Sequence, residues 1–471
     1  MSEAPTFRDL DELAPLIDRL MEAGLSKPPA EDKATLFAAC AGSLSEIGVP
    51  REAEVRCFYV PGRIEVLGKH TDYAGGRSIL AATERGFCVV ASPREDNAVH
   101  MIAAVSGQGE DFAIDPDLKV KTTGWANYPM TVARRLARNF SGPLRGADLA
   151  FASDLPQASG MSSSSALLVA SYLVLADVNK LSARDEYRRN IKDSEALAGY
   201  LGTVENGQSF GTLVGDKGVG TFGGSEDHTA ILCCRAGKLS QYSYCPVRPE
   251  RVIDMPRGYV FAVGCSGVVA EKTGDAREKY NRASARARLA AEAWNQAAGR
   301  NDPHLAAAVR SSPHAAARIR AILNSSRVDS ATPEELAGRF EQFHAENEEI
   351  LPAAGEALAE KNLVIFGECV DRSQKLAEEL LGNQVPETVF LARSARQIGA
   401  VAASAFGAGF GGSVWALVKA SDAEGMLAEW ARRYAEAFPV PAGNATFFMT
   451  HAGPAAFRVC AGAGRKGPAG T

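Results

Sequence analysis

The sequence lacks the features that mark several large classes of protein. No apolar run is long enough to cross a bilayer, and the first 50 residues carry no charged-then-apolar signal segment. No long basic run appears and the formal net charge is −5, which argues against binding to nucleic acid or to a membrane surface. The nine cysteines show no C-x-x-C spacing, so they predict reduced thiols rather than disulfides or a zinc site. We therefore expect a soluble, cytoplasmic protein.

Two familiar nucleotide-binding patterns are also missing. The P-loop pattern G-x-x-x-x-G-K-S/T does not occur. The glycines of Gly407–Gly412 fit G-x-G-x-x-G, but they lead into a predicted strand at 413–418 instead of a helix. Arg432 and Arg433 stand where the dinucleotide fold needs an acid. A Rossmann oxidoreductase is therefore excluded by context.

The length of 471 residues and a hydrophobic content of 46% predict a large core and two domains. Apolar spacing predicts helices within 8–48, 125–138, 275–381 and 389–398. Strands are predicted at 55–60, 64–67, 86–92, 99–104, 147–152, 228–245, 258–265, 413–418 and 445–450. The Gly/Ala/Lys-rich tail 461–471 is expected to be flexible.

Four consecutive serines give the strongest local signal. Ser162 to Ser165 follow Gly160 and run into the apolar stretch 166–176, which predicts a loop that opens a buried helix. The start of a helix has unpaired N–H groups and attracts phosphate, and serine hydroxyls can ligate Mg²⁺. Simple helix capping is the alternative, but one serine would be enough for it.

Two other stretches combine acids, histidines and glycines. The first, Arg63–Gly76, contains His70 and Asp72 and ends in Gly-Gly. The second, Gly223–His228, contains Asp227 and is preceded by Glu205. Such groups suit ligand binding, metal binding or general-base work. They equally suit an Asp-capped turn in the first stretch and a polar hairpin turn before a strand at 229–233 in the second.

Taken together, these stretches resemble the GHMP kinases, and among them the galactokinases. Arg63–Gly76 is similar to the galactokinase signature G-R-x-N-x-I-G-E-H-T-D-Y-x-x-G. The serine loop resembles the ATP-phosphate motif P-x-G-x-G-L-S-S-S-A, and Gly407–Gly412 resembles the third motif G-A-G-F-G-G. Trp125–Tyr128 is similar to another recurrent galactokinase segment.

The resemblance implies a two-domain α+β GHMP kinase fold that acts on ATP with Mg²⁺. The N-terminal domain, 1–240, is expected to have a ribosomal-S5-like sheet with helices, and the C-terminal domain, 241–460, to be ferredoxin-like. The active site is expected in the cleft between them. The expected partners are ATP and a small sugar, and a monomer is expected.

The resemblance also implies a role for individual residues. Asp227 is expected to be the catalytic base, with Arg63 beside it. The expected sugar contacts are Lys69, His70, Asp72 and Gly224, the expected ATP contacts are Gly160, Ser162, Ser163, Ser164, Ser165 and Trp125, and the expected metal ligands are Ser163, Ser164 and Glu205. A downstream sugar-contacting tyrosine of the family has only a faint echo near Arg277 or Tyr280.

The sequence departs from the galactokinase pattern mainly on the acceptor side. Lys69 replaces a glutamate, Glu65 replaces an asparagine, and Gly224–His228 replaces G-I-M-D-Q. Lys69 either binds an anionic sugar group or forms an internal ion pair with Glu65. We expect phosphorylation of the C1 hydroxyl of galactose. The alternatives are another acceptor (galacturonate, glucuronate or arabinose) and a non-catalytic sugar/ATP sensor.

Overall fold

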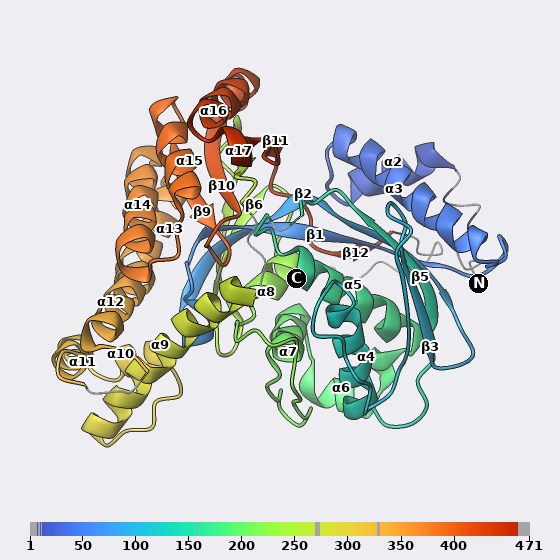
Figure 1. Ribbon diagram of the computed structural model, residues 1–471, viewed down its shortest axis with the longest axis horizontal. Coiled ribbons are helices and arrows are strands. Elements are labelled where there is room, and N and C mark those ends of the chain that lie inside the picture. Colours follow the sequence, from blue (N-terminus) through green and yellow to red (C-terminus); the bar gives the residue numbers. More distant parts are fainter. Residues whose placement is uncertain are drawn as a thin grey trace.

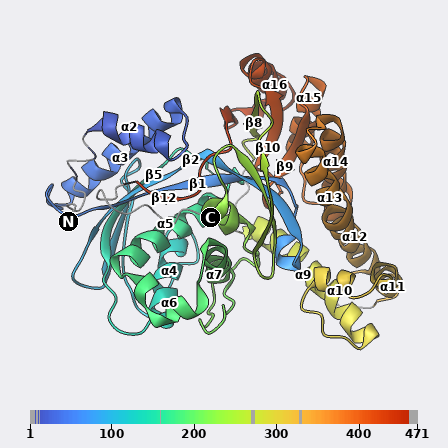
Figure 2. The ribbon, with the colours of Figure 1, turned by 180° about the vertical axis from the view of Figure 1, so that it is seen from behind.

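The computed structural model describes Phe7, Leu10 and residues 12–157, 159–268, 274–326 and 330–459. The predicted flexible tail, 461–471, lies outside the described residues. Two sheets, one of eight strands and one of four, organise the chain. Figures 1 and 2 show them side by side, with the long C-terminal helices stacked against the smaller sheet.

The larger sheet is formed by β1 (Arg56–Leu67), β2 (Arg77–Pro93), β3 (Ala98–Ala103), β4 (Gly109–Ala113), β5 (Ala147–Ser153), β6 (Lys238–Ser243), β7 (Arg248–Asp254) and β12 (Phe457–Arg458). Its helices are α2 (Leu13–Glu22), α3 (Lys27–Glu46), α4 (Asn127–Asn139), α5 (Ser163–Val178), α6 (Asp185–Asn190), α7 (Ser194–Asn206) and α8 (Glu226–Cys233). The predicted domain boundary at 240/241 falls within β6, which pairs with β2.

Both faces of the larger sheet are buried along β1. Successive strand residues point to opposite faces, so β1 contributes Phe58 and Val60 to the core with α5, and Cys57 and Tyr59 to the core with α3. Figure 1 shows α2 and α3 on one side of the sheet and α4, α5 and α7 on the other. Because both faces of β1 are covered, its position relative to α5 is fixed by packing.

The smaller sheet has the antiparallel order β11-β8-β10-β9, with β8 (Tyr259–Cys265), β9 (Ala402–Phe406), β10 (Ser413–Lys419) and β11 (Thr446–Thr450). The helices of this part are α9 (Gly274–Ala298), α10 (Leu305–Arg310), α11 (Ala315–Leu323), α12 (Pro333–His344), α13 (Leu351–Ala359), α14 (Leu363–Leu376), α15 (Pro386–Gln397), α16 (Ala423–Ala437) and α17 (Pro439–Ala442). Trp430 of α16 and Leu391 of α15 pack on one face of the sheet. Trp415 of β10 stacks on Phe366 of α14 at the other.

Two details of the predicted secondary structure are wrong, and one strand was not predicted. The two strands predicted at 55–60 and 64–67 are the single strand β1, because Pro61 and Gly62 form a bulge with a register shift instead of ending the strand. Residues 226–233 form α8, not a strand; a short apolar run carries too little periodicity to separate the two. The run Ala402–Ala405 forms β9, although alanine has a low preference for strands.

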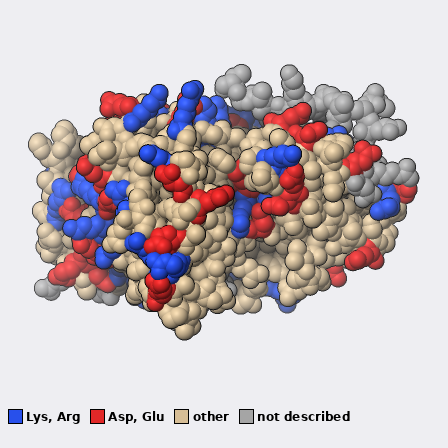
Figure 3. Space-filling model, turned by 90° about the horizontal axis from the view of Figure 1, so that it is seen from above, with Lys and Arg blue, Asp and Glu red and all other residues tan. Residues whose placement is uncertain are grey.

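Charged side chains do not segregate on the face shown in Figure 3, where acidic and basic residues are interspersed. Among the described residues, no helix combines the length and apolar character needed to span a bilayer.

Candidate active site

An ion pair joins the larger sheet to α8. Nε and Nη2 of Arg63 each lie 2.8 Å from Oδ1 of Asp227, and the two side chains are only 4% and 12% exposed. The remaining nitrogen, Nη1, donates to the carbonyl of Gly160 in the serine loop. The bulge at Pro61 and Gly62 brings the strand close to this loop, since the N–H of Arg63 donates to the carbonyl of Met161. One guanidinium thus connects strand, helix and serine loop.

The serine loop leads directly into α5. Ser162 adopts a left-handed conformation, with φ of 60°, and its buried hydroxyl has no hydrogen-bond partner among the described residues. Ser163 and Ser164 form the first turn and are half-buried. A buried, unpaired hydroxyl beside the free N–H groups of a helix start is a fit for a phosphate oxygen.

The serine that reaches the acids is Ser165. Its hydroxyl donates to Oε2 of Glu205, at 2.8 Å, and lies 3.3 Å from Oδ2 of Asp227. Glu205 comes from the last turn of α7, and its Oε2 is 3.2 Å from Nε2 of His228. The metal ligands expected from the sequence were Glu205, Ser163 and Ser164; these two serines precede Ser165 by two residues and by one residue. Oxygen donors with one or two carboxylates are what Mg²⁺ prefers, so this set fits that ion.

The glycine-rich stretch Gly407–Gly412 lies against the serine loop. A Cβ at Gly407 would be 2.7 Å from the carbonyl oxygen of Gly160, so only glycine allows this approach. The hydroxyl of Ser413 donates to the carbonyl of Ser159 at 2.6 Å. The two loops, far apart in the sequence, therefore form one continuous wall.

The residues of the predicted sugar signature lie beside the ion pair. Oδ2 of Asp72 accepts the N–H of Glu226 at 3.2 Å, and Cβ on Gly224 would approach that oxygen to 2.5 Å. His70 has its Nδ1 2.9 Å from the hydroxyl of Tyr73 and its Nε2 3.0 Å from the carbonyl of Ala408. This pairing fits the tautomer that carries its proton on Nε2.

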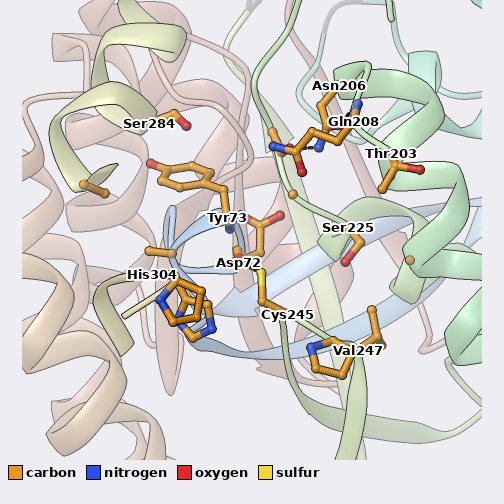
Figure 4. Close-up of a pocket in the computed structure, with 18 of the residues that line it drawn as sticks. Asp72, Tyr73, Thr203, Asn206, Gln208, Ser225, Cys245, Val247, Ser284 and His304 are labelled. Carbon is orange, nitrogen blue, oxygen red and sulfur yellow. Dashed lines mark hydrogen bonds between the residues drawn. The ribbon is translucent and has the colours of Figure 1, made fainter. Parts of the chain in front are cut away.

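The pocket is formed by residues from the part of the molecule with the larger sheet and from the part with the smaller sheet. It is lined by Arg63, Glu65, His70, Asp72, Glu205, Gly223, Gly224, Glu226, Asp227, His228, Tyr280, Gly407 and Ala408. Asp72, Gly223 and Gly224 also line a wider cleft of about 1630 Å³. Figure 4 shows Asp72 in this cleft, between the side of Thr203 and Asn206 and the side of Ser284 and His304. The cleft is therefore an approach from solvent to Asp72.

The surroundings of Lys69 differ from those expected for a residue that contacts the sugar. Its side chain is buried, and Nζ donates to the hydroxyls of Ser404, at 2.6 Å, and Ser373, at 3.2 Å. Ser373 in turn donates to Glu346 at 3.0 Å. Lys69 is not among the described residues that line the pocket. Its ammonium instead holds the end of β1 against α14 and β9.

Sequence reasoning gave no role to several pocket residues, among them Tyr280, Glu65 and Glu226. Tyr280 of α9 packs on His70, with ring centroids 5.1 Å apart. In the sequence, it was indicated only by a weak similarity to the family's downstream segment with the sugar-contacting tyrosine. Glu65 and Glu226 stood out as departures from the family pattern, but no spacing joined them. Burial raises the pKa of both carboxyls, and repulsion from Glu65 and Asp72 raises that of Glu226 further.

Trp125 precedes α4 and packs edge-on against Phe151, with ring centroids 5.1 Å apart. This contact ties the segment to the core of the larger sheet. Its expected contact with ATP stays a prediction, as do those of Gly160 and Ser162–Ser165.

Comparison with known proteins gives consistent matches. The chain matches the model of the GHMP kinases N terminal domain over residues 127–205, the galactokinase galactose-binding signature over 46–93, and the GHMP kinases C terminal model over 355–436. It is 29% identical to a galactokinase of Roseiflexus sp., over 80% of this chain and 87% of that protein. It is 30% identical to a galactokinase of Chloroflexus aggregans, over 81% and 88%.

The fold is similar to the crystal structure of Lactococcus lactis galactokinase complexed with galactose. The TM-score is 0.72 at 23% identity, covering 90% of this chain and all of the other. The Methanococcus jannaschii mevalonate kinase is more distant, with a TM-score of 0.53 at 14% identity over 86% of this chain and 99% of that one.

Proposed function

Because the chain belongs to the galactokinase family of the GHMP kinases, we propose that it transfers the γ-phosphoryl group of ATP to a sugar hydroxyl. The acceptor we propose first is the C1 hydroxyl of galactose, since the relatives are named galactokinases. The observation that carries the proposal is the Arg63–Asp227 pair, held against the start of the serine helix.

The residues of the pair divide the chemistry between them. Oδ1 of Asp227 is occupied by Arg63, while Oδ2 lies toward Ser165 and is placed to accept the proton of the attacking hydroxyl. Arg63 offsets negative charge on the phosphoryl group in transfer. The N–H groups at the start of α5 and the hydroxyl of Ser162 bind phosphate oxygens. These contacts account for most of the catalysis, because phosphoryl transfer depends mainly on the positioning of the reactants and on the neutralisation of charge.

Mg²⁺ is proposed to bind at Glu205 and Ser165, with Ser163 and Ser164 next to the phosphates. The ion, when bound, neutralises charge on the phosphate oxygens. The support is the hydrogen bond between Ser165 and Glu205, which brings two oxygen ligands together at the first turn of α5.

The acceptor is proposed to contact Asp72, His70 and the backbone at Gly224. A uronate acceptor now has less support, because the ammonium of Lys69 is engaged by Ser373 and Ser404. Arabinose remains an alternative, since it offers the same hydroxyl pattern without C6. A silent sensor is disfavoured by the complete set of Arg63, Asp227 and Glu205.

We also propose two domains, with the boundary moved to the segment between β7 and β8. The support is that β6 and β7 belong to the larger sheet, while β8 is central in the smaller one.

The test is ATP turnover against a panel of sugars. Galactose, galacturonate, glucuronate and arabinose are compared at equal concentrations, with the sugar phosphate identified by NMR. Galactose 1-phosphate is the expected product. Absence of turnover with every sugar, together with measured ATP binding, would favour the sensor.

A further inference from the structure

Two glutamates meet in the wall of the acceptor pocket. Glu65 follows Arg63 by two residues on a regular stretch of β1, so the two side chains leave the same face of the strand. Glu226 directly precedes Asp227 in the first turn of α8. The strand thus presents Arg63 to Asp227 and Glu65 to Glu226, and an acid–acid pair lies beside the ion pair.

Both carboxyl groups of this pair are buried in the lining of the pocket. Glu65 is 3% exposed and Glu226 6% exposed. Oε2 of Glu65 is 3.4 Å from the N–H of Gly407, and Oε1 has no N–H or alcohol donor among the described residues. Glu226 lies within hydrogen-bonding reach of Glu65, and two carboxyl groups can share a hydrogen bond only when one of them is protonated. The raised pKa of both groups agrees with a shared proton.

The nearby cations Arg63 and Lys69 lower the pKa of Glu65 by their charge, but they donate their hydrogen bonds to other groups. Arg63 is held by Asp227 and by the carbonyl of Gly160, and Lys69 donates to Ser373 and Ser404. The same pocket is also lined by Asp72 and Glu205. The pocket is therefore lined by more carboxyl groups than cations.

We propose that the Glu65–Glu226 pair selects the acceptor by charge: it binds an ammonium group, so the enzyme prefers an amino sugar to its neutral isostere and rejects a sugar carboxylate. The inference rests on the proposed sugar kinase activity. On binding, the ammonium takes the place of the shared proton between the carboxylates, and that proton leaves to solvent. An ammonium brings three N–H donors, and charge-assisted hydrogen bonds are roughly twice as strong as neutral ones.

The first test compares acceptors of similar shape and different charge. Galactosamine and galactose differ by an ammonium in place of a hydroxyl, and galacturonate carries a carboxylate. We expect kcat/KM for galactosamine to exceed that for galactose by roughly tenfold or more, and galacturonate to be the poorest. The double variant Glu65→Gln/Glu226→Gln should bring the galactosamine/galactose ratio to about one or below. Glu250→Gln changes a carboxylate that lines neither cavity, and should keep the wild-type ratio.

The second test measures binding without turnover. Titration calorimetry at pH 6, in buffers of different ionisation enthalpy, should show release of about one proton per bound galactosamine and none for galactose. Thermal melting first establishes that each variant is folded. Affinity for galactosamine equal to or below that for galactose, or a ratio unaffected by the double variant, overturns the proposal. If no sugar is phosphorylated but galactosamine binds with proton release, the kinase assignment fails while the ammonium site stands.

Discussion

Oδ1 of Asp227 accepts a hydrogen bond of 2.8 Å from Nε of Arg63, and the two residues are 164 positions apart in the chain. The pairing engages Oδ1 of the carboxylate. Its other oxygen, Oδ2, lies 3.3 Å from the hydroxyl of Ser165, at the start of the serine helix. In the proposed mechanism, Asp227 therefore faces the start of α5 without having to rotate.

Asp227→Asn should therefore keep ATP binding and lower turnover by roughly 10²-fold or more, the usual scale for loss of a positioned base. Steady-state kinetics and nucleotide titration measure the two effects separately. An amide still hydrogen-bonds to neighbouring groups but accepts no proton at neutral pH. Near-normal turnover would rule out Asp227 as the base and direct attention to Glu226.

Glu205→Gln should raise the Mg²⁺ concentration needed for half-maximal rate more than it raises the KM for sugar. The reason is that a neutral amide replaces the carboxylate nearest to Ser165. Ser165→Ala should move the same parameter in the same direction, more weakly. Titration of activity with MgCl₂ at fixed ATP is the measurement. A change confined to the KM for sugar would contradict this assignment.

The serine loop and the sugar signature were predictable because each concentrates its chemistry within a few residues. The fold class followed from the resemblance of these motifs to those of the GHMP kinases. The acid–acid pair was not predictable, because Glu65 and Glu226 are brought together by the packing of α8 on β1. The surroundings of Lys69 were not predictable for the same reason. An ion pair with the nearby Glu65 was one interpretation of the sequence, whereas the hydrogen-bond partners of the ammonium, Ser373 and Ser404, lie more than 300 residues away in the chain.

Gly224→Ala should weaken sugar binding selectively. The added Cβ would lie 2.5 Å from Oδ2 of Asp72, so the carboxylate has to move. We expect the KM for the sugar to rise by roughly tenfold or more while the KM for ATP changes little. Gly425→Ala is a suitable control, because no atom lies within 4 Å of a Cβ at that position. Equal effects on both KM values would mean that the substitution disturbs the whole site.

Lys69→Met should destabilise the protein and leave the preference between galactose and galacturonate unchanged. Removing the ammonium leaves the buried hydroxyls of Ser373 and Ser404 without their donor, which costs about 1 to 3 kcal/mol. Lys375→Met is the matched control, since that side chain is 68% exposed and its pair with Glu379 contributes little. Urea unfolding and the ratio of kcat/KM values are the measurements. A changed sugar preference would instead indicate that Lys69 contacts the acceptor.

Glu84 should make the stability of the protein depend on pH in the acid range. Its carboxylate accepts hydrogen bonds from the N–H of Ser26, at 2.7 Å, and from the N–H and Nδ1 of His451, both at 3.0 Å. Burial alone would raise its pKa, but the hydrogen bonds from His451 and Ser26 outweigh burial and lower the pKa to about 2. The carboxylate thereby ties β2 to the start of α3 and to the end of β11.

A pKa lowered in the folded state stabilises the protein above the pKa of the unfolded chain, and the stabilisation is lost as the pH falls toward the folded value. The shift from 4.5 to about 2 corresponds to a contribution on the order of 3 kcal/mol at neutral pH. Glu84→Gln should lower the free energy of unfolding by up to this amount at pH 7, and the difference from wild type should shrink steadily between about pH 5 and pH 3. Urea unfolding of both proteins across this range measures it. A difference that stays constant with pH would show that the substitution acts through packing, not through the charge of Glu84.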